Sequence, residues 1–322
     1  MKFNINVRST QIEHVLILVG LLTCFIHFYV TAITIDTQMI ILLSLVFLVG
    51  VPHGALDFLV DEQNEVVDNR HFSIKKFVRI YLFRLFIFSL LWMVPWLAFS
   101  LFIIFSIFHF GETDMSSIMK PNKSSIVLYT TYGAFILSLL LFTHVKEIEV
   151  AVPIIGTYLQ GSIFYNFIQH YTYVIISVFA FIFFSTLFWQ IRKNNIAKIN
   201  ILKIVQLGFL VFIISTLPML LAFTFYFALW HSILSVRNIF SYFKSFNNAK
   251  KFVLICNKSI LFSLLALGSI VGLYFGLHYF MPDMNLLFAL LIVLSVLTLP
   301  HLTVMHGMYK NYSRNLHPSL KS

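Results

Sequence analysis

Histidines are the residues of this chain with the clearest capacity for chemistry, and four of them recur at similar positions in long apolar runs. His53, His109, His231 and His301 each stand about 12 to 15 residues into a predicted membrane-spanning helix. The four helices are expected to run in the same direction, so the imidazoles should lie at a similar depth. A single histidine of this kind would be interpreted as a buried residue hydrogen-bonded across a helix interface. Four at one depth favour a shared metal site, and imidazoles without cysteine suit iron, zinc or copper.

Carboxylates near these histidines could orient them, because a metal-bound imidazole usually gives its second ring N–H to an acceptor. Asp57 follows His53 by one helical turn, and Glu112 and Asp114 follow His109. The alternative is that these acids simply end helices at the membrane interface. The residues expected to surround the ligands are Asp57, Glu112, Asp114 and His306.

Aromatic side chains crowd the histidines in sequence, within a chain that holds 37 Phe, 14 Tyr and 4 Trp. Most Phe residues are expected to face lipid. A tunnel for a long polyene would show this local pattern, and so would a tightly packed core. The tunnel candidates are Phe108, Phe110, Phe227 and Trp230.

Composition determines the class of protein. The chain is 59% hydrophobic and 11% charged, with a mean hydropathy of +0.90, whereas soluble domains carry about 25% charged residues. The sequence therefore predicts an all-α, polytopic integral membrane bundle. Polar segments are short, so residues 1–322 are expected to form a single transmembrane domain.

About ten transmembrane helices are predicted, with long runs divided near Pro95 and Pro218 because proline interrupts or kinks helices. With both termini in the cytoplasm, the inner segments carry nearly all Lys and Arg residues, and the outer segments hold only Lys146. The net charge of +10 is therefore explained by membrane topology and by contact of the inner segments with anionic lipids. Nucleic-acid binding is not needed to explain it. The expected spans are 13–35, 39–60, two within 77–111, one ending near 142, 171–191, two within 202–240, 258–280 and 285–309. A polar loop is expected at 61–76, and His144 is expected at the outer interface.

Four short motifs resemble those of the Brp/Blh family, the bacterial and archaeal β-carotene 15,15′-dioxygenases. Their order, their spacing and the multi-span architecture all agree with this family over nearly the whole chain. The motifs are Pro52-His53-Gly54-Ala55-Leu56-Asp57, Phe108-His109-Phe110-Gly111-Glu112-Thr113-Asp114, Trp230-His231-Ser232 and Pro300-His301-Leu302.

The resemblance implies an Fe(II) enzyme of the cell (inner) membrane that uses O2 to cleave β-carotene at its central double bond into two retinals. A retinal-binding rhodopsin is the implied candidate recipient. By the same resemblance His53, His109 and His231 are iron ligands. Ser235 stands where the family often has another histidine, so a fourth ligand is expected from His301, with His306 in reserve.

Two other classes of function compete with this interpretation. Di-metal lipid desaturases and hydroxylases use clustered histidine boxes, and this sequence has no such box. A non-enzymatic carotenoid-binding or transport protein could use the histidines to relay protons or fix helices. Transporters often show repeat symmetry, and no internal repeat is evident in this sequence.

Overall fold

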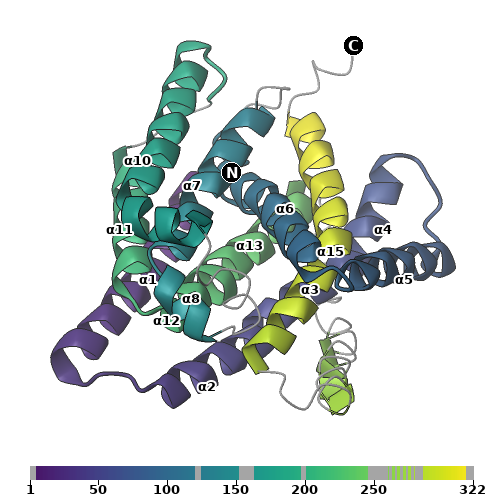
Figure 1. Cartoon of the computed structure of the whole chain (residues 1–322). Coiled ribbons are helices and arrows are strands. Elements are labelled where there is room, and N and C mark those ends of the chain that lie inside the picture. The colour runs from purple at the N-terminus through teal and green to yellow at the C-terminus, as the bar shows by residue number, and fades with distance from the viewer. Residues whose placement is uncertain are drawn as a thin grey trace.

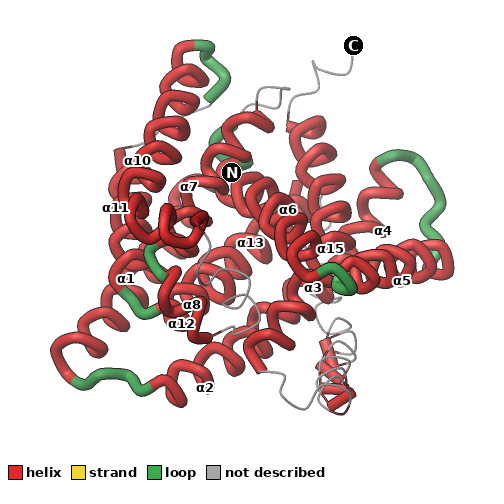
Figure 2. The backbone as a smooth tube through the Cα atoms, in the orientation of Figure 1, coloured by secondary structure: helices red, strands yellow, loops and turns green. Residues whose placement is uncertain are grey.

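The computed structural model describes residues 5–119, 125–151, 163–196, 201–245 and 286–316, with scattered residues between 260 and 279. This part of the chain is helical apart from one isolated bridge between Met119 and Ile196 (Figures 1 and 2). Among the described residues, seven helices are long and apolar enough to cross a membrane, which indicates a multi-pass membrane protein. The predicted all-α membrane class is therefore confirmed, while ten spans and the orientation of the termini stay predictions.

Both predicted proline interruptions are confirmed. Helix α5 (Ile74–Leu91) ends before Pro95, which is the first residue of α6 (Pro95–Met115). Helix α11 (Ile201–Thr216) likewise ends before Pro218, and α12 (Met219–Phe223) follows it. Proline suits the first helical turn because its missing N–H has no intrahelical partner at that position.

The first two predicted spans contain irregular helix. Helix α1 (Ile5–Phe25) continues into a π-helical turn, η1 (Ile26–Val30). After a short link the chain forms four consecutive segments that together make one long candidate span. These are α2 (Ile35–Leu45), η2 (Val46–Gly50), α3 (Val51–Ala55) and α4 (Asp57–Val67).

The polar loop predicted for 61–76 is wrong in extent, because α4 continues to Val67. Three consecutive polar residues in this part of α4, Gln63, Asn64 and Glu65, are buried instead of facing water. Asn64 is an example: its side-chain amide donates to the Val304 carbonyl at 3.2 Å and accepts from the Tyr242 hydroxyl at 2.8 Å. Tertiary partners thus stabilise a helical turn that hydropathy alone assigned to a loop.

Six further helices complete the described part of the chain. They are α7 (Ser125–Phe142), α8 (Val145–Ala151), α10 (Ile163–Arg192), η3 (Thr224–His231), α13 (Ser232–Ser245) and α15 (Leu286–Leu316). The first of them, α7, ends at Phe142 as predicted. Helix α10 begins well before the predicted span and has non-helical dihedrals at Tyr171. His144 lies in the turn after α7; it is 3% exposed, and its Nε2 lies 2.8 Å from the Leu217 carbonyl, so its ring packs inside the protein, while its interfacial position stays a prediction. The predicted span 258–280 falls outside the continuously described residues.

Close packing of α6 on α7 fixes one wall of the bundle. A Cβ atom added to Gly111 would lie 1.8 Å from the Tyr129 carbonyl oxygen, and one added to Gly133 would lie 1.8 Å from that of Ile107. Only glycine allows the two backbones to approach so closely. Helix α15 in turn packs on α4, α5 and α6, and α13 contacts α3, α6 and α15. The helices that carry the four histidines therefore meet in the interior (Figure 1).

Candidate metal centre

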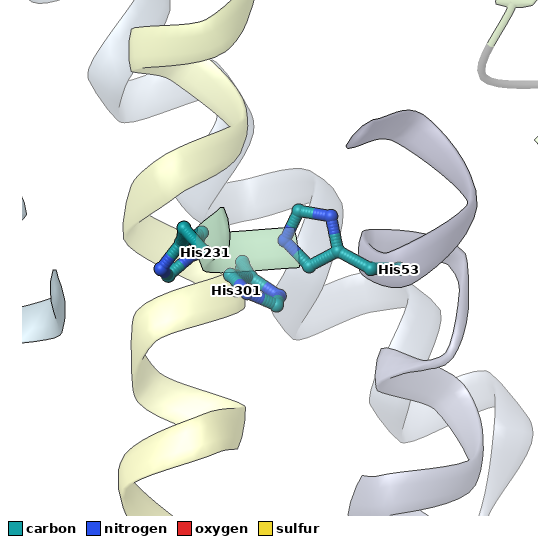
Figure 3. A group of neighbouring side chains, drawn as sticks. All are labelled: His53, His231 and His301. Carbon is teal, nitrogen blue, oxygen red and sulfur yellow. The ribbon is translucent and has the colours of Figure 1, made fainter. Parts of the chain in front are cut away.

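Three histidines from three separate segments of the chain meet in the interior. His53 comes from α3, His231 from the end of η3 and His301 from α15, and Figure 3 shows their rings turned toward one another. Each offers a ring nitrogen that lies within 4.8 Å of the others. The three residues are 5%, 1% and 7% exposed. A buried set of imidazoles at this spacing could hold a metal ion.

His109 from α6 adjoins this triad without belonging to the set that meets the 4.8 Å spacing. It is 2% exposed, and its ring centroid lies 4.8 Å from that of His231 and 4.9 Å from that of His301. His53 lies 4.9 Å from His301 and 5.6 Å from His231 by the same measure. The structure thus brings together all four histidines that the depth argument selected.

The ring nitrogens of this cluster fit a metal ion chemically. Nδ1 of His53, Nδ1 of His231, Nε2 of His301 and both ring nitrogens of His109 are buried without a hydrogen-bond partner. Buried polar atoms in folded proteins are nearly always bonded. So many unbonded nitrogens at one point are readily explained if they coordinate an ion, since neutral imidazole is the common metal-binding form of histidine.

The backbone around two of these histidines departs from regular α-helix. The π-helical turn η2 lies just before Pro52-His53, where proline was predicted to open the helix, and η3 ends at His231. The hydroxyl of Ser232, the first residue of α13, donates to the Phe227 carbonyl in η3 at 2.8 Å, which supplies a partner for the widened turn. π-Helical turns rotate the following side chains relative to an α-helix and occur frequently at functional sites. In α15, Pro300 directly precedes His301.

Two of the predicted carboxylates bond to histidines of α15. Asp57 Oδ1 lies 2.7 Å from His301 Nδ1, and Glu112 Oε1 lies 2.8 Å from His306 Nδ1. Asp57 and Glu112 are each 2% exposed. The His306 side chain is 49% exposed and forms a separate pair with Glu112. His306 does not belong to the group of three histidines whose ligand nitrogens lie within 4.8 Å of one another.

Asp114 has a different environment from the one predicted. Its Oδ2 accepts hydrogen bonds from Tyr132 at 2.8 Å, Trp230 at 3.2 Å and Tyr226 at 3.4 Å, and its Oδ1 has no hydrogen-bond partner. The reason is helical geometry. Asp114 lies five residues beyond His109, so its side chain points about 140° away from that of His109 around the axis of α6. Glu112 lies three residues beyond His109 and points only about 60° away from it.

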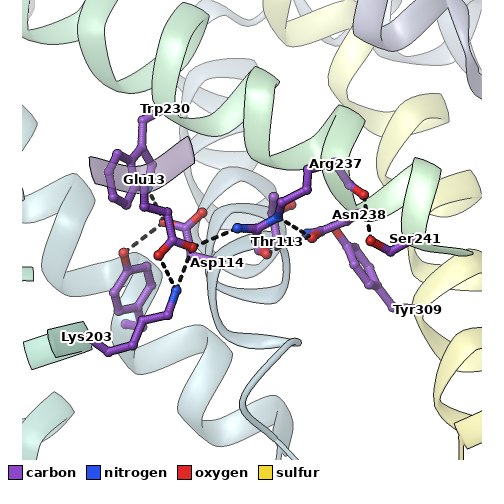
Figure 4. Close-up of polar contacts among 10 residues, drawn as sticks. Glu13, Thr113, Asp114, Lys203, Trp230, Arg237, Asn238, Ser241 and Tyr309 are labelled. Atoms are coloured by element: carbon purple, nitrogen blue, oxygen red, sulfur yellow. Dashed lines mark hydrogen bonds and ion pairs between the residues drawn. The ribbon is translucent and has the colours of Figure 1, made fainter. Parts of the chain in front are cut away.

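The surroundings of Asp114 form a polar network whose members come from α1, α6, α11 and α13 (Figure 4). Buried Glu13 forms ion pairs with Lys203 and with Arg237, the latter at 2.7 Å. Asn238 donates to the Thr113 carbonyl at 2.9 Å. Sequence reasoning missed these contacts because their members come from four distant segments, and no local motif signals them.

The four predicted tunnel residues lie in three different places. Phe110 and Phe227 lie beside His231, with ring centroids 4.6 and 6.1 Å from it. Phe108 packs instead on His306 at 5.6 Å. Trp230 lines a cavity of about 60 Å³ beside Asp114. A larger polar cavity of about 160 Å³ lies between α4 and α5. Its wall includes Tyr81, a residue that no sequence motif indicates as functional.

Comparison with known families identifies one match. The family model described as beta-carotene 15,15'-dioxygenase matches residues 44–309, which include all four clustered histidines. No match was found among curated proteins or among solved structures. The family match favours a dioxygenase over the desaturase, hydroxylase and transport alternatives. By this match the chain belongs to the beta-carotene 15,15'-dioxygenase family, and it is a carotene dioxygenase that cleaves β-carotene centrally to retinal.

Proposed function

We propose that the cleavage takes place at an iron(II) centre held by His53, His231 and His301, with His109 as a fourth ligand. The observation that carries this proposal is the buried meeting of the three histidines, whose ligand nitrogens lie within 4.8 Å of one another. The unbonded ring nitrogens of His109 and its centroid distances to His231 and His301 support its inclusion.

The donor set and the reaction together favour iron. Imidazole nitrogens suit zinc, copper, iron and nickel. Zinc has no redox chemistry, and a dioxygenase must transfer electrons to O2. When bound, iron(II) would supply the capacity to activate O2 that amino-acid side chains lack.

The protein's own side chains would position the substrate and exclude water. Phe110 and Phe227 together place apolar ring surface beside His231, with their own centroids 6.4 Å apart. A polyene is apolar and flat, so such surfaces can bind it and fix its register without hydrogen bonds. The 2.7 Å contact with Asp57 would hold the His301 ring in one orientation. Neutral imidazole ligands would leave the ion its full positive charge.

The test is metal analysis combined with product analysis. The protein would be purified in detergent without oxygen and loaded with Fe(II), and His53→Ala, His231→Ala and His301→Ala variants would be compared with it. We expect each variant to lose most of its bound iron and its formation of retinal in β-carotene-producing cells. His170→Ala is the matched control because His170 lies exposed on α10. Full iron content and full retinal yield in the three variants would refute the ligand assignment.

Topology and location extend the proposal. We infer that residues 1–322 form one transmembrane domain of ten spans in the cell inner membrane, with both termini in the cytoplasm. The placement of Lys and Arg supports this orientation, and membrane lipids are then direct partners. A retinal-binding rhodopsin is the proposed recipient of the product. Reporter fusions at the C-terminus test the topology: fluorescence of a cytoplasmic reporter supports it, and activity of a reporter that needs export contradicts it.

A further inference from the structure

We propose that Tyr81 is a positioning residue for the metal centre and acts on His301 through Asp57. This inference rests on the proposed function, because it assumes that the histidine cluster binds a metal ion. Tyr81 lies on α5, which contributes none of the four clustered histidines.

The geometry is a chain of two hydrogen bonds that uses both oxygens of one carboxylate. The Tyr81 hydroxyl donates to Asp57 Oδ2 at 3.0 Å, and His301 Nδ1 lies 2.7 Å from Asp57 Oδ1. A carboxylate with one bonded oxygen can still swing about its side-chain torsions. A second bond from a different helix fixes the plane of the group, and Asp57 is 2% exposed, so water contributes little to holding it.

The position of this carboxylate determines what His301 offers to an ion. A carboxylate only accepts hydrogen bonds, so the 2.7 Å contact places the ring proton on Nδ1. Nε2 then carries the free lone pair, and it is the His301 nitrogen that is buried without a partner. Tyr81 therefore helps to set both the tautomer and the ring plane of this ligand, although it lies two hydrogen bonds away from it.

The Tyr81–Asp57 bond joins α5 to α4, and other contacts already hold α5 in place. Lys76 on α5 forms an ion pair with Glu65 on α4 at 3.4 Å, and further bonds join α5 and the residue that follows it to α15. Arg84 donates to the Thr303 hydroxyl at 2.5 Å, and Trp92 donates to the Ser295 hydroxyl at 2.7 Å. These contacts lie on either side of His301 along α15 and do not involve Asp57. Removing one of these bonds is therefore a control that shows the effect of losing an interhelical hydrogen bond that does not involve Asp57.

Tyr81 also separates Asp57 from polar surroundings. It lines the cavity of about 160 Å³ whose wall includes the charged residues Asp61, Lys76 and Arg84. A cavity of this size and polarity can hold several waters. Removal of the Tyr81 side chain would let such water compete for Asp57 Oδ2, so truncation to alanine should be more damaging than loss of the hydroxyl alone.

The experiment measures metal affinity of the full-length protein in detergent, with Co(II) as a spectroscopic probe and a competing chelator. Outer contacts of metal ligands typically change affinity by 10- to 100-fold. We expect Tyr81→Phe to weaken Co(II) binding about 10-fold and to shift its absorption bands, and Asp57→Asn to weaken it by up to about 100-fold. Ser295→Ala, which removes the bond between α15 and Trp92 at the end of α5, should leave both the affinity and the spectrum unchanged.

The double variant separates positioning from a structural effect. If Tyr81 acts through Asp57, Tyr81→Phe should weaken binding no further once Asp57 is already Asn, whereas independent effects would multiply. Thermal unfolding of the metal-free variants should match that of Ser295→Ala. Multiplying effects, or a Tyr81→Phe affinity equal to that of Ser295→Ala, would overturn the proposal for Tyr81. Failure of the unmodified protein to bind Co(II) would instead overturn the metal centre itself.

Discussion

Gly111 offers a sharp test of how the bundle positions His109. A Cβ atom at Gly111 would lie 1.8 Å from the Tyr129 carbonyl oxygen, where real Cβ contacts are at least 3.0 Å. Gly111→Ala would therefore force α6 and α7 apart by about 1.2 Å at this point. His109 lies only two residues away on the same helix, and its centroid is 4.8 Å from that of His231.

The expected cost has two parts. Overpacking a close-packed contact destabilises a protein by about 1–3 kcal/mol. A misplacement of about 1 Å at a reacting centre can lower the rate about 100-fold. We therefore expect Gly111→Ala to lower retinal formation per folded protein by about 100-fold, with a lower temperature of thermal unfolding.

Gly54 is the matched control, and it makes the prediction counterintuitive. It directly follows His53, yet a Cβ added there would meet no atom within 4 Å beyond its chain neighbours and the backbone of its own helix. Alanine is about 1 kcal/mol more favourable than glycine within a helix, so Gly54→Ala should retain full activity and equal or higher stability. The assay is retinal formation by purified protein, normalised to folded protein. Near-normal activity of Gly111→Ala, or an equal loss in Gly54→Ala, would refute the reasoning.

Three further outcomes follow from the geometry. His306→Ala should keep bound iron but lower the free energy of unfolding by about 1–3 kcal/mol, because buried Glu112 loses its hydrogen-bond partner. Loss of iron in this variant would instead make His306 a ligand. Asp114→Ala should likewise leave the iron content unchanged but lower the temperature of thermal unfolding, because Trp230 and Tyr132 lose the carboxylate to which both donate. A variant as stable as the unmodified protein would argue against a stabilising role for this network. Chelation should abolish retinal formation, Fe(II) should restore it and Zn(II) should not; restoration by zinc would contradict a redox role for the ion.

Much of the fold could be predicted because it depends on local properties of the chain. Apolar runs predict membrane helices wherever they occur, and Pro95 and Pro218 interrupt helices through their own backbone chemistry. The polar segment of α4 was wrongly assigned to a loop, since its helix is stabilised by distant partners such as Val304 and Tyr242.

The proximity of the four histidines could be predicted from their depth, but their partners could not. Asp57 was selected because it follows His53 by one turn, yet its imidazole partner is His301 on another helix. Glu112 follows His109, yet it bonds to His306. Sequence spacing places residues along one helix, whereas a hydrogen-bond partner depends on how two helices are rotated against each other.

The sequence by itself determined the membrane class, the family motifs and the similar positions of four imidazoles along their apolar runs, because hydropathy and helical rise act along the chain. The tertiary structure alone decided that three of the imidazoles meet within 4.8 Å while His109 adjoins them. It also decided that Asp114 lies elsewhere and that Tyr81 reaches Asp57. The physical reason is that these contacts depend on helix rotation, π-helical turns and close glycine packing. Each of these features is determined jointly by side chains from segments that are distant in the sequence.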